Sequence, residues 1–310
     1  MKENSKEMNI FGKKQGYIHI DGEFVKKCDR EFETLLSDEV KRFCDERNPR
    51  VIGLTGPTCS GKTTTAKKLI AHLGNSSKIV HVISLDDFFK EVFSREELER
   101  QGVDLSKIDF DSPDTLDIEL FGSFVSDLVT KGRATKPIFD FKTGERREYE
   151  SFVADDDDVF LFEGIQVLYP SVISVIEKMG GVVIGVRPMS AIEVDGETFE
   201  PDFVRLCRRI VRDYNFRGST PEFTLSIWDG VRRNEEINIF PYFDRCDLKI
   251  DTVLPYELNV LAPYLRRILA EIDESEEHFD VCAEILKRFE KIEGTDSSVI
   301  SADSLYREFV

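Results

Sequence analysis

The sequence predicts an α/β fold in which a parallel β-sheet carries helices on both faces, preceded by a small appendage. Two observations support this prediction. From about residue 50 onward, short apolar runs alternate with segments of helical spacing, which is typical of strands joined by helices. The first apolar run, 51–55, leads through a glycine-rich turn into a helix, as expected for a P-loop NTPase-type sheet. We therefore divide the chain into an appendage (1–49), a P-loop domain (50–273) and an acidic C-terminal helix and tail (274–310).

The appendage is expected to begin with a β-hairpin. Two strand-like runs, 17–20 and 23–25, flank Asp21-Gly22, a dipeptide typical of a type I′ turn. A helix over 29–47 should follow, because its apolar residues recur at helical spacing.

The remaining elements are expected in the following order. Strands are predicted at 51–55, 78–85, 159–162, 181–186 and 248–250. Helices are predicted at 62–73, near 94–101, at 115–131, across 201–240 and at 256–273. The stretch 137–153, marked by Pro137, should be extended, and the tail should hold one helix and a frayed end.

Composition and charge exclude several classes of function. The net charge of −18 disfavours a general nucleic-acid binder and an anionic membrane surface as partners, because both require a basic protein surface. The six cysteines form no CxxC pair and resemble neither a disulfide framework nor a zinc site. We see no signal peptide and no apolar run long enough for a membrane helix, so we expect a cytoplasmic protein.

One motif predicts binding of ATP with Mg²⁺. The pattern G-x-x-x-x-G-K-[ST] is matched by Gly56, Pro57, Thr58, Cys59, Ser60, Gly61, Lys62 and Thr63. Such a loop points successive backbone N–H groups at the β-phosphate, and the following helix presents its positive end to the same anion. Lys62 should reach the β- and γ-phosphates, and the Thr63 hydroxyl should bind Mg²⁺. We include Thr64, the next residue, among the expected nucleotide contacts.

Two acidic residues lie where strands should end. Asp86 follows the second predicted strand, and Glu163 closes the third. Ligands of open parallel sheets bind at the carboxyl ends of the strands, so both carboxylates could face the metal and the γ-phosphate. A carboxylate in that position can bind Mg²⁺ or accept the proton of an attacking hydroxyl.

A row of arginines predicts a lid over the phosphates. Arg205, Arg208, Arg209 and Arg212 fall at i, i+3, i+4 and i+7, on one face of a helix, and Arg217-Gly218 follows. A basic helix that closes over a triphosphate supplies positive charge to the transition state and excludes water. We expect Arg208 and Arg212 to act in catalysis together with Lys62. Arg209 and Arg217 should contact the nucleotide, and Arg205 should contact the acceptor.

Taken together, these motifs resemble the uridine kinase/phosphoribulokinase family of P-loop kinases, in particular a bacterial uridine-kinase-like branch. The similarity covers about residues 50–270. It is carried by the phosphate loop, Ser84–Phe89 (S-x-D-[SD]-F-Y), Phe110–Asp114 (F-D-x-P-D), the strand-end Glu163-Gly164, Arg205–Gly218, Trp228–Glu236 and Asn238–Tyr242.

This resemblance implies roles for particular residues. Asp86 would be the catalytic base and a substrate contact, with Thr63, Asp86 and Glu163 around Mg²⁺. Asp111 would hold the ribose hydroxyls, and the 205–217 helix would be the lid of a P-loop kinase domain.

The family's base-reading segment differs here. Where uridine kinases have a pattern like Y-D-x-x-x-H-x-R, this chain has Phe139 for the tyrosine and Gly144 for the histidine. Loss of these polar groups should weaken or redirect base selectivity. Phe139 would then offer the base only an apolar ring.

The leading hypothesis is ATP-dependent phosphorylation of a nucleoside 5′-hydroxyl. The alternatives are a kinase of another small hydroxyl compound, such as a sugar phosphate or vitamin precursor, and a non-catalytic ATP-sensing module. The absence of an N-K-x-D guanine signature makes a GTPase switch a poor match. We expect ATP and a small-molecule acceptor as partners, and homo-oligomer formation stays open.

Overall fold

The computed structural model describes residues 13–74, 79–91, 112–141 and 143–310. Within these ranges, the central sheet has five parallel strands in the order β10-β7-β2-β6-β3. Their bounds are Leu248–Asp251, Val182–Arg187, Val51–Thr55, Val159–Glu163 and Val80–Ser84, in that order across the sheet. The predicted parallel sheet is therefore confirmed.

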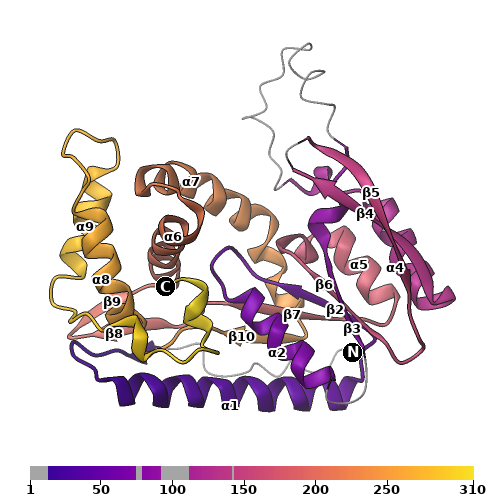
Figure 1. The fold of residues 1–310 in the computed structure, drawn as a ribbon, viewed down its shortest axis with the longest axis horizontal. Helices are drawn as coiled ribbons and strands as arrows, with labels where there is room; N and C mark the ends of the chain where they lie inside the picture. Colours follow the sequence, from indigo (N-terminus) through magenta and orange to yellow (C-terminus); the bar gives the residue numbers. More distant parts are fainter. Residues whose placement is uncertain (1–12, 75–78, 92–111, 142) are drawn as a thin grey trace, which may run out of the picture.

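Helices cover both faces of this sheet, as predicted (Figure 1). On one face lie α1 (Gly22–Arg47) and α2 (Lys62–Gly74), whose apolar side chains pack against β2, β6, β7 and β10. On the other face lie α4 (Ile118–Lys131) and α5 (Pro170–Lys178). Burial on both faces explains why the three inner strands, β7, β2 and β6, are almost continuous apolar runs.

The parallel arrangement brings three chain segments to one edge of the sheet. Because β2, β3 and β6 run in the same direction, the loops that follow them emerge together. These are the glycine-rich loop after β2, a 3₁₀ turn (Leu85–Phe88) after β3, and a second 3₁₀ turn (Ile165–Leu168) after β6. The candidate site is built from these loops.

The predicted N-terminal hairpin is wrong. Asp21-Gly22 does not form a turn between strands, because Asp21 is the N-cap of α1 and its side chain accepts a hydrogen bond from the Phe24 N–H at 2.8 Å. Aspartate is favoured at N-caps as well as in turns, and the helix allows both Val25 and Cys28 to be buried. The strand that precedes it, β1 (Lys13–Gln15), pairs with β8 (Ala191–Val194), which pairs in turn with β9 (Glu197–Phe199).

The segment predicted as helical across 201–240 consists of two helices. The first, α6 (Pro201–Arg217), ends at Gly218, whose φ of 63° is readily adopted by glycine. The second, α7 (Pro221–Asn238), begins after the N-cap Thr220. Both helices lie above the carboxyl edge of the sheet in Figure 1.

The other predicted elements have the following outcomes. The extended stretch around 137–153 is an antiparallel hairpin of β4 (Arg133–Asp140) and β5 (Glu145–Val153). The closing helix is α8 (Glu257–Leu269), and the tail contains α9 (Phe279–Arg288). The helix predicted near 94–101 lies outside the described residues.

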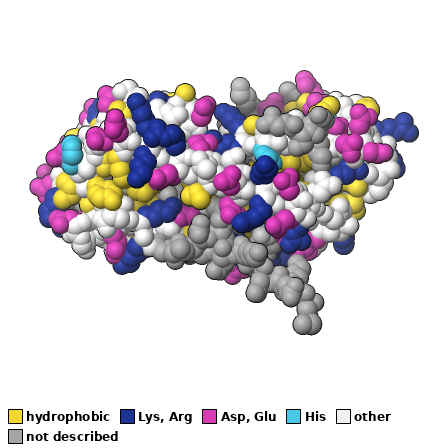
Figure 2. Space-filling view, turned by 90° about the horizontal axis from the view of Figure 1, so that it is seen from below, with side chains coloured by type: hydrophobic (Ala, Val, Ile, Leu, Met, Phe, Trp, Pro, Cys, Tyr) yellow, Lys and Arg dark blue, Asp and Glu magenta, His cyan; other side chains and the backbone are white. Residues whose placement is uncertain are grey.

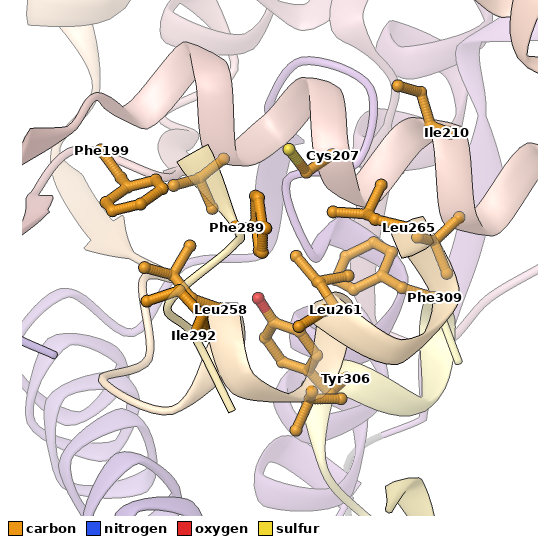
Figure 3. Close-up of a cluster of buried hydrophobic side chains, with 14 of the residues drawn as sticks. Phe199, Cys207, Ile210, Leu258, Leu261, Leu265, Phe289, Ile292, Tyr306 and Phe309 are labelled. Carbon is orange, nitrogen blue, oxygen red and sulfur yellow. The ribbon is translucent and has the colours of Figure 1, made fainter. Parts of the chain in front are cut away.

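The frayed end predicted for the tail is also wrong. The last residues pack into a hydrophobic cluster with α6, α8 and α9, where Leu305, Tyr306 and Phe309 are at most 1% exposed. Figure 3 shows the Tyr306 and Phe309 rings beside Leu261 and Leu265 of α8. Burial of these apolar side chains stabilises the end of the acidic tail.

The surface agrees with the acidic but mixed composition. On the lower face of the molecule, acidic and basic side chains are interspersed (Figure 2). Among the helices of the described ranges, none combines the length and the apolar character needed to span a bilayer.

Candidate active site

The glycine-rich loop has a backbone that few residues other than glycine could adopt. Gly61 has a φ of 89°, and a Cβ atom on Gly56 would lie 2.0 Å from the Val186 carbonyl oxygen. Cys59 also has a positive φ, of 57°. The loop thus winds tightly between β2 and α2, and the unpaired N–H groups at the start of α2 lie beside it.

A cleft of about 460 Å³ opens between this loop, the ends of β3 and β6, and helices α6 and α7. It brings together most of the residues predicted to contact nucleotide, metal or acceptor: Thr58, Cys59, Lys62, Thr63, Asp86, Glu163, Arg209, Arg212 and Arg217. Gly56, Pro57, Ser60 and Gly61 form the loop backbone, and Thr64 lines a neighbouring cavity.

Lys62 is held over the loop that precedes it. Its Nζ donates hydrogen bonds to the Gly56 carbonyl at 2.8 Å and the Pro57 carbonyl at 3.4 Å. Burial lowers the pKa of Lys62, while the nearby carboxylates of Glu163 and Glu308 oppose that shift. The site therefore places one buried ammonium group where phosphates would meet the loop.

Asp86 is oriented by a residue that the sequence analysis did not single out. The Gln166 amide, buried in the turn after β6, donates a hydrogen bond from Nε2 to Asp86 Oδ1 at 2.7 Å. Burial raises the pKa of Asp86, whereas Gln166 and Lys62 act in the opposite direction. An aspartate whose pKa is raised toward neutral pH becomes a stronger proton acceptor when ionised.

Two arginines of α6 face the cleft and are fixed by one carboxylate. Arg212 donates from Nη2 and Nε to Asp213 Oδ1 at 2.6 and 2.9 Å, and Arg209 donates from Nε to Asp213 Oδ2 at 3.3 Å. Arg212 also donates from Nη1 to the Thr58 hydroxyl of the loop at 3.2 Å. Asp213 thus holds two guanidinium groups that line the same cleft as Lys62 and Asp86.

The roles predicted for Arg208 and Arg205 need correction, because neither lines the cleft. Arg208 is fully buried and donates to both oxygens of Glu257, at 2.8 and 2.9 Å, and to the Cys59 carbonyl at 3.3 Å. Arg205 pairs with Glu235 and lies against the Trp228 ring, 5.0 Å from its centroid.

The arginine row misleads because α6 is enclosed on all sides. Every residue from 204 to 213 is buried, so a stripe of arginines does not reveal which guanidinium faces the cleft. Arg205 and Arg208 stabilise packing, and Arg209 and Arg212 face the phosphate loop.

Two predicted acceptor contacts have different outcomes. Asp111 lies outside the described residues. Phe139 is buried and does not line the cleft; it packs against Phe89 and Phe141, with ring centroids 5.6 and 5.1 Å away, and these two rings do line it. The structure therefore does not support the predicted contact of Phe139 with the acceptor, because its ring is buried against two other rings that line the cleft in its place.

The donor atoms of the cleft suit Mg²⁺. The Thr63 hydroxyl and the Asp86 and Glu163 carboxylates line one cavity, and all three offer the hard oxygen ligands that this ion prefers. In the described ranges, no cluster of three histidine, cysteine or acidic side chains could hold an ion.

Several residues that line the cleft had no site role predicted from the sequence, although three of them lie in the motifs quoted above: Phe89, Gln166, Asn234, Glu235 and Glu308. Gln166 could have been found, since it follows the strand-end Glu163 by three residues in a loop expected at the same edge. Glu308 offers no such signal, because its tail lies outside every motif of the sequence.

Comparison with known proteins agrees with this geometry. The model of the phosphoribulokinase / uridine kinase family matches residues 51–258. The chain is similar to uridine-cytidine kinase B of Dictyostelium discoideum, with 30% identity over 250 residues that cover 80% of this chain and 88% of the relative. It is similar to a uridine kinase of Clostridium botulinum, with 31% identity over 180 residues, 58% of this chain and 76% of the relative.

Among solved structures, the phosphoribulokinase of Rhodobacter spheroides is 17% identical with a TM-score of 0.44, covering 64% of this chain and 68% of that chain. The family match spans the loop, both strand-end carboxylates and the arginine helix described above. The chain belongs to the phosphoribulokinase / uridine kinase family.

Proposed function

We propose that this protein transfers the γ-phosphate of ATP to the 5′-hydroxyl of a nucleoside. The observation that carries the proposal is the meeting of the loop lysine, Lys62, with two carboxylates and two arginines in one cleft, namely Asp86, Glu163, Arg209 and Arg212. The names of its relatives, uridine and uridine-cytidine kinases, support a nucleoside as the acceptor.

Asp86 is the residue best placed to accept the acceptor's proton. It is partly buried at the end of β3, and Gln166 fixes the orientation of its carboxylate. As the hydroxyl oxygen bonds to the γ-phosphorus and the bond to the β,γ-bridging oxygen breaks, Asp86 takes up the hydroxyl proton.

The basic residues of the cleft stabilise the charge on the phosphates. Lys62 meets them from the loop side and Arg209 and Arg212 from α6, and these groups are already in position because Asp213 and the Gly56 carbonyl hold them. Mg²⁺, held by Thr63 with Asp86 or Glu163, would neutralise phosphate charge when it is bound with the nucleotide.

The acceptor's base is expected to meet aromatic rings. Phe89 and Phe141 line the cleft near Asp86, whereas the hydroxyl and imidazole typical of uridine kinases are replaced by Phe139 and Gly144. Stacking on apolar rings is tolerant of base identity, so selectivity among nucleosides should be weak.

Replacement of Asp86 by asparagine tests the proposed role of this residue. The variant should bind ATP like the wild type but lose roughly a hundredfold or more in kcat, the scale expected for loss of a general base. Binding is measured by calorimetry and turnover by nucleoside monophosphate formation.

The matched control is Asp87→Asn. Asp87 pairs with Lys136, does not line the cleft, and has the same side chain one position along the turn. A normal kcat of the Asp86→Asn variant would refute Asp86 as the base. If Asp87→Asn alone lost activity, Asp87 would be the base.

A further inference from the structure

The last residues of the chain, 304–310, which we call the C-terminal segment, pack directly on the phosphate loop. The Leu305 Cδ1 atom lies 2.1 Å from where a Cβ on Gly61 would be, so the leucine covers the loop at its tightest turn. Ser304 donates a hydrogen bond to Asp29 of α1 at 2.8 Å. This segment lies outside the part of the chain, 51–258, that matches the family.

Two aromatic residues fix the segment in place. The Tyr306 hydroxyl donates a hydrogen bond to the Glu257 carboxylate and accepts one from Arg208 Nε at 3.2 Å. Arg208 also lies 5.2 Å from the centre of the Phe309 ring, and Figure 3 shows Tyr306 and Phe309 within the hydrophobic cluster. Because Arg208 donates to the Cys59 carbonyl as well, one guanidinium joins the C-terminal segment to the phosphate loop.

Between these anchors, the side chain of Glu308 lies at the candidate active site, where its charge acts on Lys62. Its side chain lines the same cleft as Lys62 and Arg212, and also a second cavity of about 450 Å³ between α2 and the C-terminal segment. Its Oε2 atom is buried and has no hydrogen-bond partner within the described part of the chain. Burial raises the pKa of Glu308, and the charge of Lys62 is the largest influence that opposes the shift.

A buried carboxylate oxygen without a donor is costly, so it commonly has a functional reason. The same carboxylate acts on Lys62, one of the cations expected to meet the phosphates. A negative charge fixed at this point repels a triphosphate, and the repulsion is weaker when Mg²⁺ has neutralised part of the triphosphate charge.

We propose that Glu308 is a specificity-determining residue of the phosphate-donor site, where it favours the Mg²⁺ complex of the nucleotide over the free nucleotide. The inference rests on the proposed function in that ATP is the donor. It assigns to the C-terminal segment a part in donor selection, in addition to its packing on the loop.

The test compares binding of ADP and ATP to wild type and to Glu308→Gln, each measured by calorimetry with EDTA and with saturating Mg²⁺. Removing one charge near the phosphates should strengthen binding of the free nucleotides by about tenfold and change binding of the Mg²⁺ complexes much less. Glu308→Asp keeps the charge and should keep the wild-type preference.

Glu274→Gln is the matched control, because it removes the same charge from an exposed position that lines neither cavity. It should bind both forms of nucleotide like the wild type. Unfolding midpoints of all variants show whether Glu308→Gln keeps the packing of Tyr306 and Phe309.

Equal binding of free nucleotide by wild type and Glu308→Gln would overturn this inference alone. The inference would also be overturned if Glu308→Gln bound free nucleotide like the wild type but had lost affinity for the Mg²⁺ complex. That result would make Glu308 a metal ligand. If the wild-type protein bound no nucleotide under either condition, both this inference and the proposed function would fail.

Discussion

Replacing Arg208 with methionine should destabilise the folded protein strongly, because Arg208 is the partner of a buried carboxylate. Arg208 and Glu257 are both fully buried, and they are joined by two hydrogen bonds of 2.8 and 2.9 Å. Removing one partner of such a pair leaves the other charge uncompensated, at a cost of about 3–5 kcal/mol. The variant also loses the bond from Arg208 to the Thr252 carbonyl, at 2.7 Å.

Denaturant unfolding followed by circular dichroism measures this loss. Burial already raises the pKa of Glu257, and removal of Arg208 should raise it further. The folded variant then keeps a proton that the unfolded chain releases, so its stability deficit should grow as the pH rises above the unfolded pKa of glutamate. The double variant Arg208→Met/Glu257→Gln, which removes the uncompensated charge, should recover part of the stability. An Arg208→Met protein that unfolds at the wild-type midpoint would refute this interpretation of Arg208.

Three further predictions concern the cleft. Lys62→Ala should abolish phosphotransfer and weaken ATP binding, because Lys62 is the ammonium group of the loop that is expected to meet the phosphates. A near-normal kcat in the folded variant would contradict the phosphate-loop assignment. Asp86 must be ionised to accept a proton, and burial raises its pKa above the ordinary aspartate value of 3.8. The value of kcat/KM should therefore fall on acidification, and this fall should begin at a pH above that ordinary value. A pH profile of kcat/KM without this acid limb would argue against Asp86 as the base. Gln166→Leu removes a hydrogen bond that favours the ionised form of Asp86, so it should move the acid limb of kcat/KM to higher pH. An acid limb at the wild-type pH would show that Gln166 does not affect the pKa of Asp86.

The sheet and much of the cleft could be predicted from the sequence because their signals are local. The phosphate loop is a contiguous motif between an apolar strand and a helix, and Asp86 and Glu163 follow apolar runs directly. Parallel strands bring such residues to one edge whatever the details of packing, so the cleft follows from topology.

The remaining features depend on contacts between distant parts of the chain. Whether Arg208 or Arg212 faces the cleft is decided by what surrounds α6, namely Glu257 on one side and Thr58 on the other. Asp21 suits a turn and an N-cap equally, and only burial of the helix selects between them. Glu308 reaches the cleft through packing of the tail on the loop, which no pattern near residue 308 indicates.

The central claim is that this cleft phosphorylates the 5′-hydroxyl of nucleosides, and direct product analysis tests it. Purified protein is incubated with saturating Mg²⁺ and ATP and, in turn, with uridine, cytidine, adenosine and guanosine, and kcat/KM is measured from 5′-monophosphate formation. We predict turnover with weak discrimination, because Phe89 and Phe141 offer the base only apolar rings. A preference for one base of about a thousandfold, roughly 4 kcal/mol, would contradict the apolar base site. Bound ATP with no phosphorylation of any ribonucleoside would contradict the claim itself.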